Sequence, residues 1–130
     1  METKRLILCD TNIVVNAFRE MPSILTELDR LGFDRLTIAS VTTAELYFGM
    51  RKGEKRRTLE LVRRFKTVHF DKAISRRMIG YQYEYMNRMS IPDAIIGATA
   101  IEYNFTLWTD NRQDFDFLPG IRFHDLVYTQ

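Results

Sequence analysis

The sequence predicts an α/β fold, in which helices cover a central, mostly parallel sheet of four to five short strands. Short apolar runs alternate along the whole chain with longer amphipathic stretches, which is the order expected of strand–helix–strand units. No internal repeat, low-complexity segment or linker rich in Pro, Gly or Ser divides the 130 residues. We therefore expect one domain, spanning residues 1–130, that is large enough to bury a core.

The first half of the chain predicts two strands and three helices, and several of their ends carry a recognisable signal. Pro22 suits a first helical turn, and Gly32 suits the end of the same helix. Ser40 offers a hydroxyl that can cap the helix following the second strand. In chain order we expect a strand at 5–9, helices at 12–20 and 22–31, a strand at 36–39, and a helix from 40 to about 50.

The second half predicts three further helices and three strands. Gly53 interrupts the preceding helix, and Asp71 and Pro92 stand where helices are expected to begin. Asn104 suits the left-handed conformation in which many helices end. We expect a basic helix at 54–65, a strand at 67–70, helices at 72–88 and from 92 to about 103, a strand at 106–109, and a short strand at 121–123.

The composition indicates a cytoplasmic protein with no membrane partner. No stretch approaches the roughly 18 consecutive apolar residues of a membrane-spanning helix. The segment that opens the chain lacks the apolar core of a signal peptide. Cys9 is the single cysteine and cannot form an internal disulfide, so we expect it to be a buried, reduced thiol in the first strand.

Five acidic residues occupy positions beside or inside apolar segments, where acids are unusual. They are Asp10, Glu45, Asp93, Asp110 and Asp114. A buried carboxylate is costly unless it is paired or holds a metal, and several carboxylates in one pocket repel each other. If the strands are parallel, acids that follow strands lie at one edge of the sheet. Carboxylates are hard oxygen ligands, so the set predicts a site for Mg²⁺ or Mn²⁺ and an enzyme that acts on a phosphodiester.

Most of these acids also have a purely structural interpretation. Asp10 could cap the first helix, and Asp93 could favourably meet the dipole of its helix from the first turn. Asp110 could cap a short helix, and Asp114 could be a surface acid. Glu45 is the exception, because it lies too far into its helix to cap it and has no basic residue at i+4. The set as a whole therefore argues more strongly for function than any member does.

A local basic surface accompanies the acids, although the net charge of the chain is only +2. Between residues 51 and 66 there are eight basic residues and two acids. Such a surface suits a polyanion such as RNA, and a solvated helix face is the alternative. The candidate RNA contacts are Arg51, Lys52, Lys55, Arg56 and Arg57. His69 and His124 both lie in or beside predicted strands, which favours structural roles over metal binding.

Taken in order, four segments make the chain resemble the PIN-domain ribonucleases, and within them the VapC toxins of toxin–antitoxin pairs. Each segment by itself indicates the family only weakly, but the order and spacing of the four segments are specific. The similarity extends over nearly the whole chain. The segments are Leu8-Cys9-Asp10-Thr11-Asn12, residues 40–46 with Gly49, residues 92–100, and the closing stretch from Thr109-Asp110-Asn111 through Asp114 to Ile121.

The resemblance implies a three-layer α/β/α sandwich and a metal-dependent endoribonuclease. It implies that Asp10, Glu45 and Asp93 hold one or two Mg²⁺ or Mn²⁺ ions together with Asp110 or Asp114, a choice that the sequence leaves open. Supporting roles fall to Thr11, Asn12, Thr109 and Asn111. The resemblance also implies a homodimer and a small antitoxin whose tail occupies the site.

Two other functions compete with this interpretation. The first is a binding or regulatory module of the same fold whose catalytic site has degenerated, but the acids are all present. The second is a metal-dependent phosphatase-like or receiver-like α/β domain. The sequence has no evident phosphoacceptor Asp with a following Lys of the kind that such a domain uses.

Overall fold

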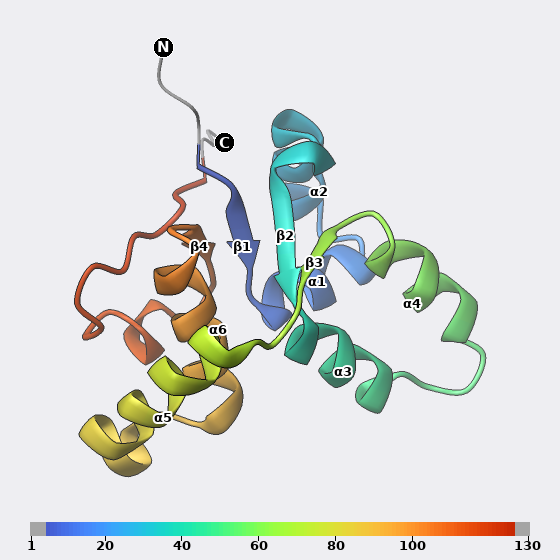
Figure 1. Cartoon of the computed structure of the whole chain (residues 1–130). Helices are drawn as coiled ribbons and strands as arrows, with labels where there is room; N and C mark the ends of the chain where they lie inside the picture. Colours follow the sequence, from blue (N-terminus) through green and yellow to red (C-terminus); the bar gives the residue numbers. More distant parts are fainter. Residues whose placement is uncertain (1–4, 127–130) are drawn as a thin grey trace.

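The computed structural model describes residues 5–126 and places a four-stranded sheet at the centre of the molecule (Figure 1). The strands are β1 (Ile7–Cys9), β2 (Leu36–Ala39), β3 (Lys66–Val68) and β4 (Thr106–Trp108), in the order β3-β2-β1-β4. All three strand pairings are parallel. Parallel neighbours need a crossover between them, and helices supply it here. The predicted α/β class with a parallel central sheet is confirmed.

Residues 5–126 also form six α-helices and three short 3₁₀ helices. The α-helices are α1 (Thr11–Phe18), α2 (Pro22–Leu31), α3 (Ser40–Gly49), α4 (Lys55–Val62), α5 (Lys72–Tyr85) and α6 (Ile91–Glu102). The 3₁₀ helices are η1 (Phe33–Arg35), η2 (Met86–Arg88) and η3 (Arg112–Asp114). None of the helices within residues 5–126 is long and apolar enough to cross a membrane.

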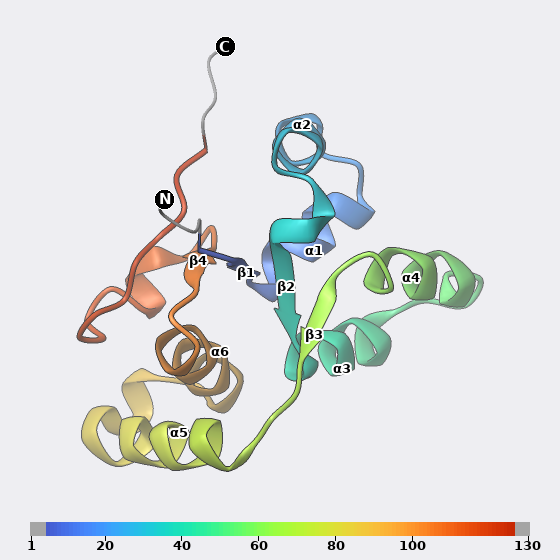
Figure 2. The same ribbon diagram turned by 45° about the horizontal axis from the view of Figure 1, so that its top comes forward.

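The sheet separates two apolar cores, and the alternation of side chains along β1 shows how. Ile7 and Cys9 belong to the core under α1 and α2, whereas Leu8 belongs to the core under α5 and α6. Successive side chains on a strand point to opposite faces, so a strand buried on both sides reads as a continuous apolar run. Figure 2 shows α5 and α6 on one side of the sheet and α1 and α2 on the other. The result is the expected three-layer sandwich.

Helix caps agree with the sequence at some positions and not at others. Asp71 caps α5, since its carboxylate accepts a hydrogen bond from the Ile74 N–H at 2.8 Å, and Asn104 takes the left-handed conformation (φ 59°) after α6. The expectation that Ser40 caps α3 is wrong. Ser40 is the first helical residue, and its hydroxyl accepts instead from the Phe70 N–H at 3.3 Å on the segment after β3. Likewise α6 is capped by Ser90, one residue before its start.

Two element boundaries also differ from the prediction. The helix expected at 72–88 ends at Tyr85, because Met86 has a positive φ of 53° that an α-helix cannot continue through. The strand expected at 121–123 is reduced to a single parallel bridge between Leu107 and Phe123. That bridge still fixes the last described segment against the edge of the sheet next to β4, through two backbone hydrogen bonds of 2.8 Å.

Candidate active site

Three of the candidate acids lie on segments that follow the carboxyl ends of the neighbouring strands β2, β1 and β4. Asp10 follows β1 directly, and Asp110 follows β4 after one residue. These strands are parallel neighbours, with Cys9 opposite Trp108, so the segments that leave them begin side by side. Asp93 comes from the first turn of α6, and Glu45 from the middle of α3, which follows β2. The sequence-based expectation that strand ends would bring these regions together agrees with this topology.

Asp10 is buried and surrounded by hydrogen-bond donors, but none of them is cationic. One carboxylate oxygen accepts from the Thr11 N–H at 2.8 Å, and the other accepts from the Thr109 hydroxyl at 2.7 Å. The amide of Asn12 adds a longer contact of 3.3 Å. Burial raises the pKa of Asp10, these hydrogen bonds partly oppose the rise, and the nearby negative charges of Glu45 and Asp114 reinforce it. Asp10 is therefore both the cap of α1 and a carboxylate with no cationic hydrogen-bond partner within residues 5–126.

Asp93 experiences the same electrostatic environment. Burial is the main cause that raises its pKa to about 6, and repulsion from Asp10, Asp114 and Glu45 adds to it. The Ser90 hydroxyl acts in the opposite direction. Four carboxylates are thus close enough for their charges to interact across the site. A pKa displaced by burial and by like charges is typical of functional sites.

The two acids that the sequence left as alternatives have different surroundings in the structure. Asp114 lies on η3, is half-buried, and contributes to the raised pKa of both Asp10 and Asp93. Asp110 is exposed, and its carboxylate accepts a hydrogen bond from the Asn16 amide at 2.9 Å. Asp110 therefore faces α1 rather than the other acids.

Hydroxyl and amide groups hold the acids in place. The Thr11 hydroxyl donates to Glu45 Oε1 at 2.7 Å and so connects α1 to α3. Thr109 bonds to Asp10, and its hydroxyl oxygen accepts from the Asn111 N–H at 3.0 Å. Thr11, Asn12 and Thr109 thus contact the acids directly, whereas Asn111 contributes through its backbone.

The acids fit a divalent cation by chemistry, although they do not enclose one. Within residues 5–126, no three carboxylate, imidazole or thiol groups are close enough together to hold a metal ion. The four neighbouring acids supply hard oxygen donors and an uncompensated negative charge. Mg²⁺ keeps several of its waters and binds through as few as one or two carboxylates, so an open set of this kind suits a hydrated ion. The buried, unpaired charge of Asp10 is the observation that supports the fit.

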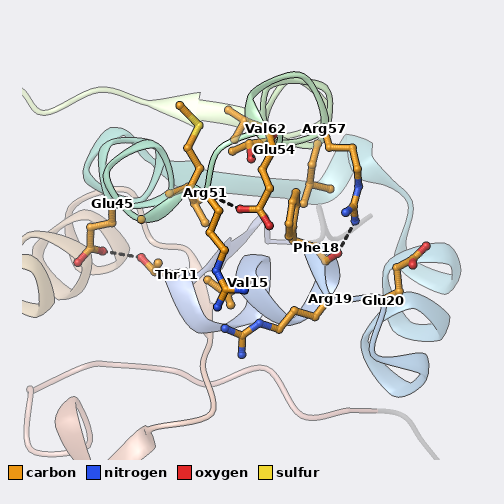
Figure 3. Close-up of a pocket in the computed structure, with 15 residues that line it drawn as sticks. Thr11, Val15, Phe18, Arg19, Glu20, Glu45, Arg51, Glu54, Arg57 and Val62 are labelled. Carbon is orange, nitrogen blue, oxygen red and sulfur yellow. Dashed lines mark hydrogen bonds between the residues drawn. The ribbon is translucent and has the colours of Figure 1, made fainter.

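A cavity of about 520 Å³ opens beside Glu45 and Thr11, between α1, α3 and α4 (Figure 3). Three arginines line it, namely Arg19, Arg51 and Arg57, together with the acids Glu20, Glu45 and Glu54. Arg57 stacks on the Phe18 ring at 4.1 Å and donates to the Phe18 carbonyl at 2.7 Å, which fixes the guanidinium at the wall.

The basic residues predicted to contact RNA divide into two groups. Arg51 and Arg57 line the cavity, whereas Lys52, Lys55 and Arg56 are exposed outside it. Arg19 was not anticipated, because it stands alone in the sequence and reaches the cavity only when α1 packs against α3 and α4. No local motif could have identified it.

A second buried carboxylate lies away from this cluster. Glu27 on α2 is 3% exposed and accepts two hydrogen bonds from the Arg30 guanidinium, at 2.8 and 2.9 Å. His124 Nε2 lies 2.7 Å from the same carboxylate, and the His124 ring packs edge-on against Trp108. The hydrogen bonds from Arg30, followed by the contact with His124, lower the pKa of Glu27 to about 2 despite its burial. His124 is therefore a structural histidine, as predicted, whereas His69 is exposed.

Comparisons with known proteins bear on the family and the fold of the chain. The family model described as "PIN domain" matches residues 7–118. Ribonuclease VapC1 of Methanocaldococcus jannaschii is 28% identical over 92% of this chain and 87% of the relative. A toxin–antitoxin complex from Klebsiella pneumoniae contains a chain with a TM-score of 0.76 and 29% identity, matched over 88% of this chain and 94% of that one. A chain of VapBC2 from Rickettsia felis, bound to a promoter DNA fragment, has a TM-score of 0.78 and 25% identity over 92% and 97%.

Proposed function

The chain belongs to the PIN-domain family, and from this premise we propose that it is a metal-dependent endoribonuclease that hydrolyses RNA phosphodiesters. The observation that carries the proposal is the mutual repulsion of carboxylates at Asp10 and Asp93, with no cationic partner among the described residues, beside a cavity whose lining includes three arginines. The similarity to a ribonuclease over most of the chain supports the same activity.

In this proposal Asp10, Glu45, Asp93 and Asp114 would hold one or two Mg²⁺ or Mn²⁺ ions that keep part of their water shell. A bound ion of this kind lowers the pKa of a water molecule and offsets negative charge on the scissile phosphate. The half-buried Asp93 orients the attacking water. Thr11 and Thr109 keep their hydrogen bonds to Glu45 and Asp10, so the acids stay in position during turnover. Asp110 has a supporting role through α1, because its carboxylate is bonded to Asn16.

The arginines of the cavity would hold the RNA backbone next to the acids. Arg51 and Arg57 present guanidinium groups that can bind phosphate oxygens in a bidentate manner. Lys52, Lys55 and Arg56 extend the positive surface outward along the start of α4. Binding through such contacts depends strongly on salt, because each neutralised phosphate releases counterions. We therefore expect affinity for RNA to fall steeply between low and moderate salt.

We further propose that the protein acts in the cytoplasm as the toxin of a toxin–antitoxin pair, and that it forms a homodimer. Similarity to chains of toxin–antitoxin complexes supports the antitoxin partner. A basic residue from the tail of such a partner could pair with the acids and compete with metal. Apolar side chains exposed on α5 and η2 support a contact with a second copy, since Ile79 is 61%, Tyr83 86% and Met86 71% exposed.

A cleavage assay on total RNA, with Mg²⁺ or Mn²⁺ and with EDTA, tests the catalytic proposal. We expect cleavage at discrete sites in the presence of metal and none with EDTA. No cleavage under either condition would favour a binding module of the same fold. Hydrolysis of a small phosphoester in preference to RNA would favour the phosphatase-like alternative.

A further inference from the structure

Thr42 is a fully buried threonine that contacts the acidic cluster through another residue. It lies in the first turn of α3, three residues before Glu45, so the two side chains share one face of the helix. Its hydroxyl oxygen is 3.0 Å from that of Thr11, which in turn is 2.7 Å from Glu45 Oε1. The three groups therefore form a chain that ends at the carboxylate.

Other buried threonines on helices make a different hydrogen bond. Thr58 on α4 donates its hydroxyl to the Glu54 carbonyl at 2.8 Å, and Thr99 on α6 donates to the Ile95 carbonyl at 2.7 Å. Both bonds return to the carbonyl four residues earlier, which is the ordinary partner of a threonine inside a helix. Thr42 instead reaches across to α1. The residue four before Thr42 is Ile38 on β2, ahead of the helix, so the contact with Thr11 is the hydrogen bond that the structure gives this hydroxyl.

The direction of these hydrogen bonds follows from counting protons. An ionised carboxylate can only accept, so the Thr11 hydroxyl must donate its single proton to Glu45. Thr11 then has only lone pairs left for its contact with Thr42, and the Thr42 hydroxyl must be the donor. Thr42 thus fixes the rotation of the Thr11 hydroxyl that holds Glu45.

We propose that Thr42 is a positioning residue, which orients Glu45 through Thr11 and so sets the affinity of the acidic cluster for a divalent cation. This inference rests on the proposed function, because it assumes that Glu45 is a metal ligand. Thr42 itself touches neither the ion nor the substrate. Partners that orient metal ligands in this way commonly contribute about 10–100-fold to metal affinity or activity.

Titration calorimetry with Mn²⁺ alone tests the inference. Thr42→Val keeps the shape of the side chain but removes the hydroxyl, and we expect it to weaken Mn²⁺ binding about 10-fold. Thr42→Ser keeps the hydroxyl and should bind Mn²⁺ like the wild type. Thr99→Val is the matched control, because it removes a buried helical hydroxyl that bonds only to its own helix, and it should leave Mn²⁺ binding unchanged. If Thr42→Val does not fold, Thr42→Ala also lacks the hydroxyl and takes its place.

Repeating the substitution in a Glu45→Ala background separates positioning from a general structural role. If Thr42 acts through Glu45, Thr42→Val causes no further loss of Mn²⁺ affinity once Glu45 has been removed. An equal loss in both backgrounds, or wild-type affinity in Thr42→Val, would overturn the inference and leave the proposed function standing. Absence of Mn²⁺ binding by the wild type would instead overturn the proposed function, and this inference with it.

Discussion

Asp10 and Glu27 are equally well buried, at 5% and 3% exposure, yet their surroundings are opposite. Glu27 is paired with Arg30 and His124, and these partners hold its pKa far below the ordinary value, at about 2. Among the residues that the structure describes, the partners of Asp10 are neutral donors and like-charged neighbours, and its pKa is raised. A buried carboxylate thus stabilises the fold at Glu27 and destabilises it at Asp10.

The difference shows that burial alone does not identify a functional acid. A buried carboxylate with a cation beside it is structurally satisfied, whereas one that faces other acids needs a ligand that the chain does not supply. The cost at Asp10 is balanced by the rest of the fold, as is usual where function requires an unfavourable arrangement. Substitutions at the two positions should therefore have opposite effects on activity and stability.

The largest expected effect is on RNA cleavage. Asp10→Asn should reduce kcat/KM about 1000-fold or more, because loss of a ligand to the metal removes several kcal/mol of transition-state stabilisation. The fold should remain, since asparagine caps a helix as well as aspartate does. Glu27→Gln is the matched control at the other buried carboxylate and should keep wild-type cleavage. Comparable losses in both variants would remove the distinction between the two regions.

The next largest effect is on stability, and here Glu27→Gln should have the larger effect and Asp10→Asn the smaller one. Glu27→Gln should lower the free energy of unfolding, because it breaks the ion pair between the buried Glu27 and the partly exposed Arg30 and leaves His124 with a weaker partner. Asp10→Asn should leave the free energy of unfolding unchanged or raise it, since repulsion among the acids falls. Urea unfolding at pH 7 measures both variants. A destabilised Asp10→Asn beside an unaffected Glu27→Gln would reverse the assignment of roles.

A smaller effect separates the two acids on the loop after β4. Asp114→Asn should reduce cleavage about 30-fold, because Asp114 is charge-coupled to Asp10 and Asp93. Asp110→Asn changes an exposed carboxylate bonded to Asn16 and should reduce cleavage only about twofold. Steady-state kinetics on one defined RNA provides the comparison. A greater loss in Asp110→Asn would show that Asp110 is the fourth acid.

The smallest effect is a pH dependence of stability. The pKa of Asp93 rises from 3.8 to about 6 on folding, so between these values the folded state binds more protons than the unfolded state. The contribution of Asp93 is therefore favourable below pH 4 and is lost as the pH rises to 6. Asp93→Asn should remove this decline, which urea unfolding from pH 4 to 8 would detect. The pKa of Glu27 is shifted in the opposite sense, so its contribution is present above pH 4.5 and lost only as the pH falls towards 2.

Much of the fold and of the acidic cluster could be predicted from local sequence patterns. Strands buried on both faces read as apolar runs, and acids that follow such strands must lie at one edge of a parallel sheet. Glu45 also indicated a functional site, because a capping role cannot explain an acid in the middle of a helix.

The features that escaped prediction all depend on contacts between distant segments. Arg19 meets the cavity only after helix packing, and the partner of Glu27 is 97 residues away at His124. The Ser40 hydroxyl bonds to the segment after β3 rather than to its own helix, so a local capping rule gave the wrong role. The role proposed for Thr42 could not be predicted from the sequence, because it depends on one hydrogen bond between Thr42 and Thr11 on another helix.

Thermal unfolding with and without Mg²⁺ tests most directly whether the unpaired acids form a metal site. At about 100 times its Kd, a ligand that binds only the folded state stabilises it by about 2.7 kcal/mol. We expect saturating Mg²⁺ to raise the Tm of the wild type and of Glu27→Gln by the same amount, and to leave Asp10→Asn unchanged. An equal rise in Asp10→Asn, or no rise in the wild type, would contradict the account.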